Sequence, residues 1–579
     1  MKGEESVMSG DDRMRVSIDD GDLRGGEEEG VRVFRGVPYA RPPVGPRRFR
    51  SPLPPERWDG VRDATRSGPA SMQMNNVNAS RVMAIVAEID PGVPGIIPGP
   101  DFALKTTYNQ PVISEDCLYL DIWVPEVAGS SPLPVYLYYH GGANMISSGS
   151  NPLERAARLA REEHVIVVRP TYRLGALGWV HLGLISDEFP EAVNLGLQDQ
   201  IAALRWVHRN ISAFGGDPEN ITVGGESCGA TAVSHLLAYP PVRPLIRRAV
   251  IQSLSPFNNW CTQQKEEAAE VAFQYLELLG ISDPVQLRDV EPERLLAVHN
   301  VLLRLFPADR NCAWRPAGPV VDGDLVPRAP AQHLSTEPYG REDFELMIGV
   351  AKDEWQFFRG HSETARHGSE DAVINVFAQI LGDDGARQLY GAYRGIYPDH
   401  EPGRILDDVM SFEFFKFSSL LIAVNLVRQG IPVYMFQFSY ELPGVGGYLR
   451  AVHTGDMPLI WRNLDEASLR RWPGYDGADP AELERIAAQF GRLYGAFLRD
   501  GDPGPDWPAF ADGQTILWFG TEVEPRPGLL DDEWAIFQAS GLKDVAGLEK
   551  LLVANVRSDL DVRRRATPVP DQAAPEETS

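Results

Sequence analysis

One serine of this chain lies in a glycine-flanked pentapeptide, Gly225-Glu226-Ser227-Cys228-Gly229. The G-x-S-x-G pattern is weak evidence by itself, but an apolar run at residues 221–224 precedes it and a helical pattern at 229–238 follows. Such a strand-to-helix turn holds a serine on strained backbone, and the small flanking residues let neighbouring backbone come close. The pattern therefore predicts a nucleophilic serine, with a glycine-rich structural turn as the alternative.

A serine hydroxyl attacks poorly unless a base takes its proton and hydrogen-bond donors stabilise the resulting oxyanion. The segment His140-Gly141-Gly142-Ala143 follows an apolar run at residues 134–139. Glycine-rich loops in this position supply backbone N–H groups to an oxyanion. The alternative is an ordinary surface turn.

The acid and the base should follow the nucleophile along the chain, each after a later strand. The segment Lys352-Asp353-Glu354 follows an apolar run at residues 345–350. Among the six histidines beyond Ser227 and its helix, only His453 follows the last predicted sheet strand, residues 433–438, on a glycine-rich loop. The alternatives are a structural loop histidine and a surface carboxylate.

The elements that would position these residues alternate between strand and helix. Predicted strands lie at residues 15–23, 31–39, 117–124, 134–139, 164–169, 221–224, 249–252, 345–350 and 433–438, and predicted helices at 194–214, 229–238 and 479–499. Alternation of this kind predicts an α/β fold with a mostly parallel sheet that is covered by helices on both faces. The stretch 256–342 reads as a mainly helical excursion from that sheet.

Composition excludes several classes of protein. The 579 residues include 43% hydrophobic residues, enough for a large core, so disorder is not the main state. The net charge of −26 disfavours nucleic-acid and anionic membrane partners, which attract basic surfaces. No run approaches about 18 apolar residues, and the acidic start does not resemble a secretory signal. Four widely spaced cysteines match neither a disulfide scaffold nor a zinc site, so we expect a reducing, cytoplasmic location and no metal.

A dense, ordered set of motifs resembles the type-B carboxylesterases, the family that includes the cholinesterases. The motifs are Phe34-Arg35-Gly36-Val37-Pro38-Tyr39-Ala40, Ser114-Glu115-Asp116-Cys117-Leu118-Tyr119-Leu120, His140-Gly141-Gly142, Asn194-Leu195-Gly196-Leu197 with Asp199-Gln200, Phe214-Gly215-Gly216-Asp217-Pro218, Gly225-Glu226-Ser227-Cys228-Gly229-Ala230, Gly349-Val350 with Lys352-Asp353-Glu354, and His453-Thr454-Gly455. The resemblance extends from about residue 31 to residue 520.

The resemblance implies a single α/β-hydrolase domain over residues 13–557, although chain length alone suggests about four domains. It implies a small N-terminal β region and long helical insertions, of which residues 256–342 are the longest. Residues 1–12 and 558–579 have compositions typical of disorder.

The same resemblance assigns roles at the matching positions. It implies Ser227 as the nucleophile, His453 as general base and acid, and Glu354 as the partner that orients His453, with Asp353 as the weaker alternative. It implies the backbone N–H groups of Gly142, Ala143 and Cys228 as oxyanion donors. The implied reaction is acyl transfer to Ser227 followed by hydrolysis, with no metal and no cofactor.

Departures from the family pattern bear on the substrate. Asn144 stands where an aromatic residue commonly follows the oxyanion glycines, and Cys228 replaces an alanine, so we expect its side chain to pack as a small hydrophobic group. Leu254 and Trp355 stand where glycine is usual, and we expect them to narrow or reshape the substrate pocket.

Two further departures are absences. Cys117 is the first cysteine, so the disulfide that the family often forms with a position near Ser71 cannot exist here. No tryptophan lies between Trp58 and Trp123, where cholinesterases bind quaternary ammonium through cation–π contact, so acetylcholine is a poor candidate.

Four hypotheses remain for the function. The first is a carboxylesterase that acts with water on small-molecule esters, and the second is a carbamate or amide hydrolase of xenobiotics. The third is a biosynthetic esterase specific to one pathway, and the fourth is a catalytically inactive binding or adhesion protein. The loop at residues 75–110 either forms an apolar lid or packs onto the domain, and the oligomeric state stays open.

Overall fold

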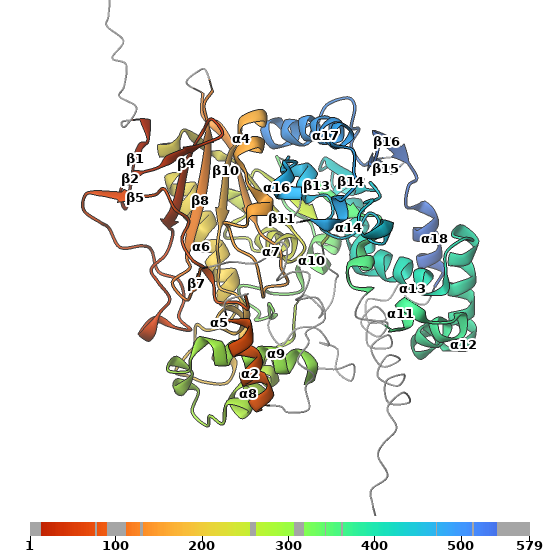
Figure 1. Cartoon of the computed structure of the whole chain (residues 1–579), viewed down its shortest axis with the longest axis horizontal. Helices are drawn as coiled ribbons and strands as arrows, with labels where there is room; N and C mark the ends of the chain where they lie inside the picture. Colours follow the sequence, from red (N-terminus) through yellow and green to blue (C-terminus); the bar gives the residue numbers. More distant parts are fainter. Residues whose placement is uncertain are drawn as a thin grey trace, which may run out of the picture.

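The computed structural model describes residues 13–75, 78–89, 112–127, 131–254, 262–305, 318–341, 343–359, 363–469, 472–511 and 514–540. Its centre is an eleven-stranded sheet with the order β16-β15-β14-β13-β12-β11-β9-β10-β8-β4-β3 (Figure 1). The strands from β10 to β15 pair in parallel, and the pairs at both edges of the sheet are antiparallel. The predicted α/β fold, an α/β-hydrolase sheet that is parallel at its centre, is confirmed.

The strands have the following bounds: β1 Arg15–Ile18, β2 Gly21–Arg24, β3 Gly26–Glu28, β4 Val31–Pro38, β5 Val61–Asp63, β6 Ala70–Ser71, β7 Ile113–Ser114, β8 Tyr119–Pro125, β9 Leu133–Tyr139, β10 Ile166–Pro170, β11 Gly216–Glu226, β12 Arg248–Gln252, β13 Glu345–Ala351, β14 Val433–Phe438, β15 Thr515–Phe519 and β16 Val523–Pro527. The prediction of one strand over residues 15–23 is wrong, because the chain turns back between β1 and β2 to form an antiparallel pair. These two strands and β5 form a small separate sheet.

The helices have the following bounds: α2 Ala79–Ile89, α4 Ala157–Glu163, α5 Gly175–Trp179, α6 Leu195–Asn210, α7 Cys228–Ala238, α8 Lys265–Leu279, α9 Pro292–Leu305, α10 Pro330–Thr336, α11 Glu363–His367, α12 Glu370–Ile396, α13 Pro402–Ser411, α14 Phe417–Arg428, α15 Met457–Ile460, α16 Glu466–Leu469, α17 Pro480–Asp500 and α18 Asp531–Ala539. A π-helical turn, Phe412–Lys416, joins α13 to α14.

Helices cover both faces of the sheet because its strands are apolar on both sides. In β9, Val135, Leu137 and Tyr139 face a core shared with α6, α7 and α14. The alternate residues, Tyr136 and Tyr138, face a second core shared with α4 and α17. A buried strand at the centre of the sheet is therefore a continuous apolar run rather than an alternating one.

A third hydrophobic cluster lies beside the sheet and joins α2, α5, α8 and α9 (Figure 1). The prediction of a loop at residues 75–110 is wrong for its first part, because Ala79–Ile89 forms helix α2, which packs against α9. Val82 and Val86 are buried there. Residues 90–111 lie outside the described part of the chain. The excursion predicted at residues 256–342 contains α8, α9 and α10, as expected.

The strands of the large sheet come from residues 26 to 527, so one sheet takes up most of the chain. The limits predicted for the domain and its two tails stay predictions, because residues 1–12 and 541–579 lie outside the description. Cys117 is a free and buried thiol.

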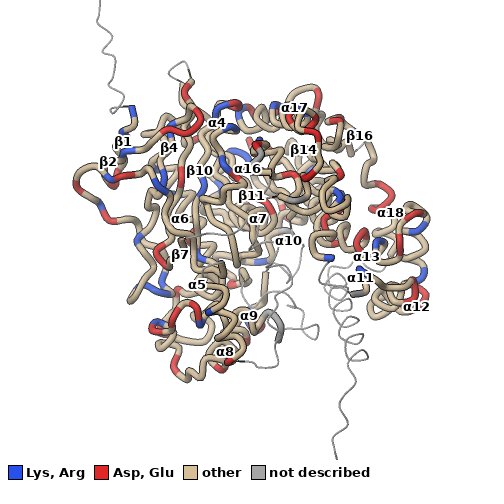
Figure 2. Tube along the Cα trace, in the orientation of Figure 1, with Lys and Arg blue, Asp and Glu red and all other residues tan. Residues whose placement is uncertain are grey.

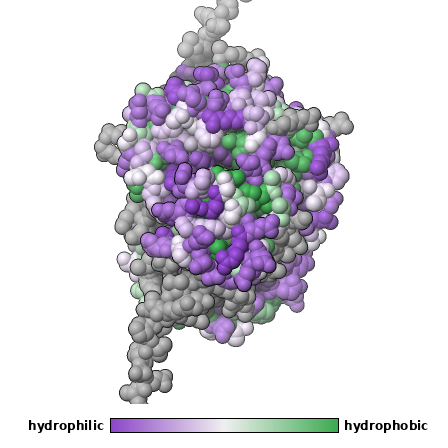
Figure 3. Space-filling model, turned by 90° about the vertical axis from the view of Figure 1, so that its right-hand side faces the viewer, coloured by the Kyte–Doolittle hydropathy of each residue, from purple (hydrophilic) through white to green (hydrophobic). Residues whose placement is uncertain are grey.

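The segment Pro402–Arg428, which comprises α13, the π-helical turn and α14, is long and apolar enough by composition to cross a membrane. However, 83% of its most apolar window is buried inside the protein, as in an internal core helix. Basic and acidic residues are interspersed along the chain trace (Figure 2). The face shown in Figure 3 is mainly hydrophilic, with hydrophobic residues gathered near its middle.

Candidate active site

Ser227 occupies the sharp turn between strand β11 and helix α7. Its φ of 56° and ψ of −123° form a conformation that residues other than glycine rarely adopt. The Ser227 N–H donates to the carbonyl of Gln252 over 2.9 Å, which ties the turn to the end of β12. A Cβ on Gly225 would lie 2.3 Å from the carbonyl carbon of Gly229. A Cβ on Gly229 would lie 2.1 Å from the backbone carbonyl oxygen of Tyr139. Both glycines are therefore required by close backbone contact, as the motif predicts.

The loop that follows strand β9 lies directly against this turn. A Cβ on Gly141 would lie 3.3 Å from the Ser227 Cβ. Gly142, Ala143 and Asn144 have φ values of 102°, 56° and 58°, so three consecutive residues of the loop adopt a positive φ. Among the described residues, no partner accepts a hydrogen bond from the N–H of Gly142 or Ala143. The loop can therefore offer two N–H donors close to the serine.

His453 follows strand β14 and its connecting loop, and it lies against the carboxylate that follows strand β13. The His453 Nδ1 is 2.6 Å from Glu354 Oε2, and both side chains are buried. The other oxygen, Glu354 Oε1, accepts from the Ala351 N–H over 2.6 Å. Asp353, the alternative acid, instead forms a buried ion pair with Arg404. The geometry therefore brings Glu354 rather than Asp353 to the histidine.

Two further carboxylates lie near His453, and sequence reasoning did not assign either a role. Glu226 Oε1 is 3.2 Å from His453 Nε2, and burial raises the pKa of Glu226. Burial also raises the pKa of Asp456 to about 7, while its Oδ2 accepts a hydrogen bond from Gln252. Burial alone would lower the pKa of His453, but the charges of Glu226 and Glu354 outweigh it and raise that pKa. A signal existed for both carboxylates, since Glu226 precedes Ser227 and Asp456 comes three residues after His453.

The contact with Glu226 predicts how pH affects activity. A histidine that acts as a base must be neutral, so activity rises as pH increases through its pKa. Glu226→Gln removes a charge that favours the protonated imidazole, so the pKa of His453 should fall and the acid limb of the profile should move about 1 pH unit lower. The measurement is kcat/KM for an uncharged ester across pH. Glu522→Gln, at an exposed carboxylate, is the matched control, and an unmoved acid limb in Glu226→Gln would contradict the prediction.

Three aromatic side chains lie close to the imidazole of His453. The rings of Phe357, Phe358 and Phe415 lie 5.8, 5.5 and 5.0 Å from the His453 ring between centroids. Phe415 belongs to the π-helical turn, which brings it toward the histidine. The aromatic side chains restrict water around His453, which strengthens its interaction with the carboxylates.

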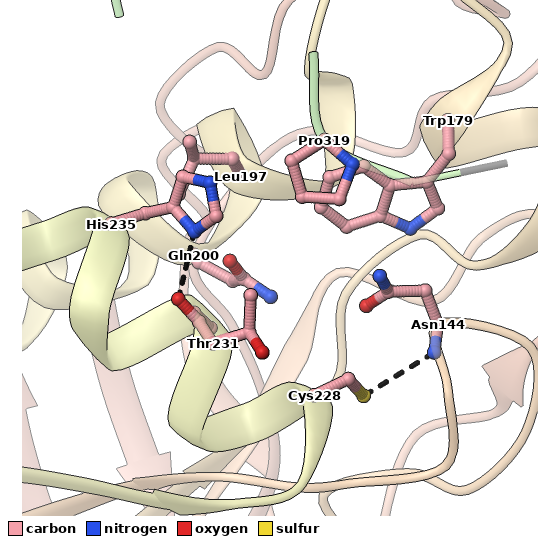
Figure 4. Close-up of a pocket in the computed structure, with 9 residues that line it drawn as sticks. Asn144, Trp179, Leu197, Gln200, Cys228, Thr231, His235 and Pro319 are labelled. Atoms are coloured by element: carbon pink, nitrogen blue, oxygen red, sulfur yellow. Dashed lines mark hydrogen bonds between the residues drawn. The ribbon is translucent and has the colours of Figure 1, made fainter. Parts of the chain in front are cut away.

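The four residues that depart from the family pattern, Asn144, Cys228, Leu254 and Trp355, are all buried. The Trp355 ring lies 5.1 Å from the ring of Phe358, which in turn lies 5.5 Å from the ring of His453. Leu254 belongs to the core cluster on the α6, α7 and α14 side of the sheet. Asn144 lines a narrow pocket next to Cys228, together with Trp179, Gln200 and His235 (Figure 4).

Comparison with known proteins identifies the family and the fold of the chain. The sequence profile of the carboxylesterase family matches residues 12–527. A phenmedipham hydrolase of Pseudarthrobacter oxydans is 34% identical over 511 residues, which are 87% of this chain and 94% of that protein. A para-nitrobenzyl esterase of Bacillus subtilis is 31% identical over 502 residues, or 86% and 92% of the two chains. The crystal structure of a carboxylesterase of Geobacillus stearothermophilus superposes with a TM-score of 0.73 at 32% identity, covering 91% of this chain and 100% of that one.

Proposed function

Because the chain belongs to the carboxylesterase family and is a carboxylic-ester hydrolase, we propose that it acts through Ser227, His453 and Glu354 and forms an acyl-enzyme. The observation that carries this proposal is the 2.6 Å hydrogen bond between His453 and Glu354, buried beside the strained turn that holds Ser227. A histidine held in this way has its Nδ1–H fixed on the carboxylate, which leaves Nε2 to accept a proton.

The proposed reaction has two halves. In the first, the Ser227 oxygen attacks the ester carbonyl while His453 Nε2 takes its proton, and the tetrahedral oxyanion accepts hydrogen bonds from the N–H groups of Gly142, Ala143 and Cys228. The intermediate collapses as His453 returns that proton to the leaving alcohol. In the second half, water gives a proton to His453, attacks the acyl carbon, and the acid leaves as Ser227 regains its proton.

The direct test is hydrolysis of p-nitrophenyl acetate by the purified protein with a stopped-flow record of the first turnover. An acyl-enzyme whose hydrolysis is slower than its formation releases one equivalent of p-nitrophenol in a burst before the steady state. Retention of the acyl group on the protein after the burst, detected by mass, would support the proposal. A protein that does not hydrolyse any of a series of p-nitrophenyl esters would overturn it.

A carbamate or amide substrate is the second candidate, because the relative at 34% identity is named as a phenmedipham hydrolase. The proposed machinery would serve either bond, so substrate choice depends on the pocket. A panel of matched esters, carbamates and anilides, with phenmedipham included, separates the candidates. A kcat/KM that is highest for an ester favours the first candidate, and one that is highest for a carbamate or anilide favours the second. A pathway-specific esterase would show one ester far above the others.

We also propose that Leu254 and Trp355 limit the size of the acyl or alcohol group. Leu254→Gly removes a buried side chain, so we expect the variant to hydrolyse longer acyl chains. The acyl length at which kcat/KM falls to half of its maximum should increase. The measurement is kcat/KM for p-nitrophenyl esters from acetate to octanoate. Leu237→Gly, which removes another fully buried leucine from the same core cluster, controls for general loosening. An unchanged acyl-length profile in Leu254→Gly would rule out this role.

A further inference from the structure

The loop from His140 to Asn144 has a conformation that its own residues do not favour. Ala143 and Asn144 are not glycines, yet both have φ values in the left-handed region, 56° and 58°. Contacts with the rest of the protein must therefore hold the loop in place. At one end of the loop, the Tyr172 hydroxyl donates to the His140 carbonyl over 2.7 Å, and the two rings stack with 4.4 Å between centroids.

At the other end of the loop, the Asn144 carbonyl accepts from the Gly175 N–H over 2.8 Å, and the side chain of Cys228 contacts the Asn144 N–H. The Asn144 N–H donates to the Cys228 Sγ over 3.3 Å, shown as a dashed line in Figure 4. The same sulfur lies 4.0 Å from the His140 carbonyl oxygen. One buried thiol therefore contacts both ends of the loop whose N–H groups are the proposed oxyanion donors.

The two residues joined by this hydrogen bond are both departures from the family pattern. Cys228 replaces an alanine, and Asn144 replaces an aromatic residue. An alanine at residue 228 has no atom that could accept from the Asn144 N–H, so the hydrogen bond from the Gly175 N–H to the Asn144 carbonyl, over 2.8 Å, would be left to hold this residue. The donor is the backbone N–H of residue 144, so it is the thiol of Cys228 that makes this contact particular to this protein.

We propose that Cys228 is a positioning residue, whose thiol holds the oxyanion loop through the Asn144 N–H in addition to the role proposed for its own backbone N–H. The inference rests on the proposed function. A loop held less firmly still binds an ester, but it places its donors less accurately for the charge that develops in the transition state. Loss of the thiol should therefore lower kcat and leave KM nearly unchanged.

The test compares Cys228→Ala and Cys228→Ser with Cys117→Ala, which makes the same change at a second buried, free cysteine away from the loop. We expect Cys228→Ala to lower kcat for p-nitrophenyl acetate about tenfold, with KM changed less than twofold. Cys228→Ser should recover most of the loss, because a hydroxyl oxygen also accepts from the Asn144 N–H. Cys117→Ala should retain the wild-type kcat.

A second measurement separates positioning from a general structural effect. A trifluoromethyl ketone forms an oxyanion with the active serine, whereas the alcohol of the same shape does not. Cys228→Ala should weaken binding of the ketone about tenfold and leave binding of the alcohol unchanged. Wild-type kcat in Cys228→Ala, or equal weakening of both ligands, would overturn the inference. If Ser227→Ala retains full activity the proposed function itself fails, whereas an inactive Ser227→Ala beside a fully active Cys228→Ala removes only the role of the thiol.

Discussion

Replacing Ser227 with alanine is expected to lower kcat/KM for p-nitrophenyl acetate by roughly 10⁴ to 10⁶-fold. The variant lacks the oxygen that forms the acyl-enzyme, so only binding and the oxyanion donors can assist direct attack by water. Alanine is smaller than serine and keeps the Cβ, so the strained turn gains no new clash. The substitution should therefore remove catalysis without unfolding the protein, and the initial rate of p-nitrophenol release measures it.

Ser234→Ala is the matched control for this variant. Ser234 is a buried serine within helix α7, two turns beyond Ser227, and its hydroxyl donates within the helix to the Thr231 carbonyl. We expect its kcat/KM to stay within about threefold of the wild type, since no catalytic group contacts it. If Ser227→Ala kept activity similar to that of Ser234→Ala, another residue would have to be the nucleophile.

The second large effect is expected for Glu354→Gln, which should lower kcat roughly 10³ to 10⁴-fold with little change in KM. The two carboxylate oxygens of Glu354 accept from different donors, one from His453 and the other from the Ala351 N–H. A carboxamide has only one acceptor oxygen, so its NH₂ group must face one of these donors. If it faces His453, the imidazole takes the wrong tautomer, and in either orientation the imidazolium loses its counter-charge.

Asp353→Asn tests whether the neighbouring acid has the same role. Asp353 pairs with Arg404 and accepts from the Ala451 N–H, so its loss should reduce thermal stability because a buried arginine loses its partner. The folded fraction of the Asp353→Asn variant should keep most of the wild-type kcat. A large loss of kcat in Asp353→Asn together with a nearly normal Glu354→Gln would reverse the assignment of the acid.

Much of the sheet was predictable because its strands are buried on both faces. Strand β14 has the predicted bounds, Val433–Phe438, and β13 ends one residue beyond its prediction. These strands are continuous apolar runs between polar loops, a pattern with few alternatives. Helix α17 was predictable for a different reason, since its apolar residues recur at helical spacing over five turns and its N-terminus is capped by Asp479.

Other elements could not be read from local pattern. Strand β15, Thr515–Phe519, is five residues long and follows a proline-rich segment, so nothing local separates it from a loop that packs against the protein. The turn of the β1–β2 hairpin is formed by acidic residues. Polar and apolar residues alternate through residues 15–23, so the pattern predicted one strand instead of two. Helix α2 follows a run of asparagines, which is typical of a loop, and its apolar side is covered by α9.

Some parts of the candidate site could also be predicted from local sequence, and others could not. The turn at Ser227 and the loop at Gly142 follow from local spacing, since glycines are required where backbone atoms approach within about 2 Å of a Cβ position. The choice between Asp353 and Glu354 depends on where Arg404 lies, and Arg404 is about fifty residues further along the chain. The contact of Glu226 with His453 likewise arises only when β11 and the loop after β14 meet in the folded sheet.

The most direct test of the account is to locate the covalent adduct that an organophosphonate ester leaves on the protein. The account predicts one adduct per chain, on the peptide that contains Ser227, formed in parallel with loss of esterase activity. It should not form in Ser227→Ala, and it should form much more slowly when His453 is replaced by alanine. An adduct on another residue, or full loss of activity without an adduct on Ser227, would contradict the account.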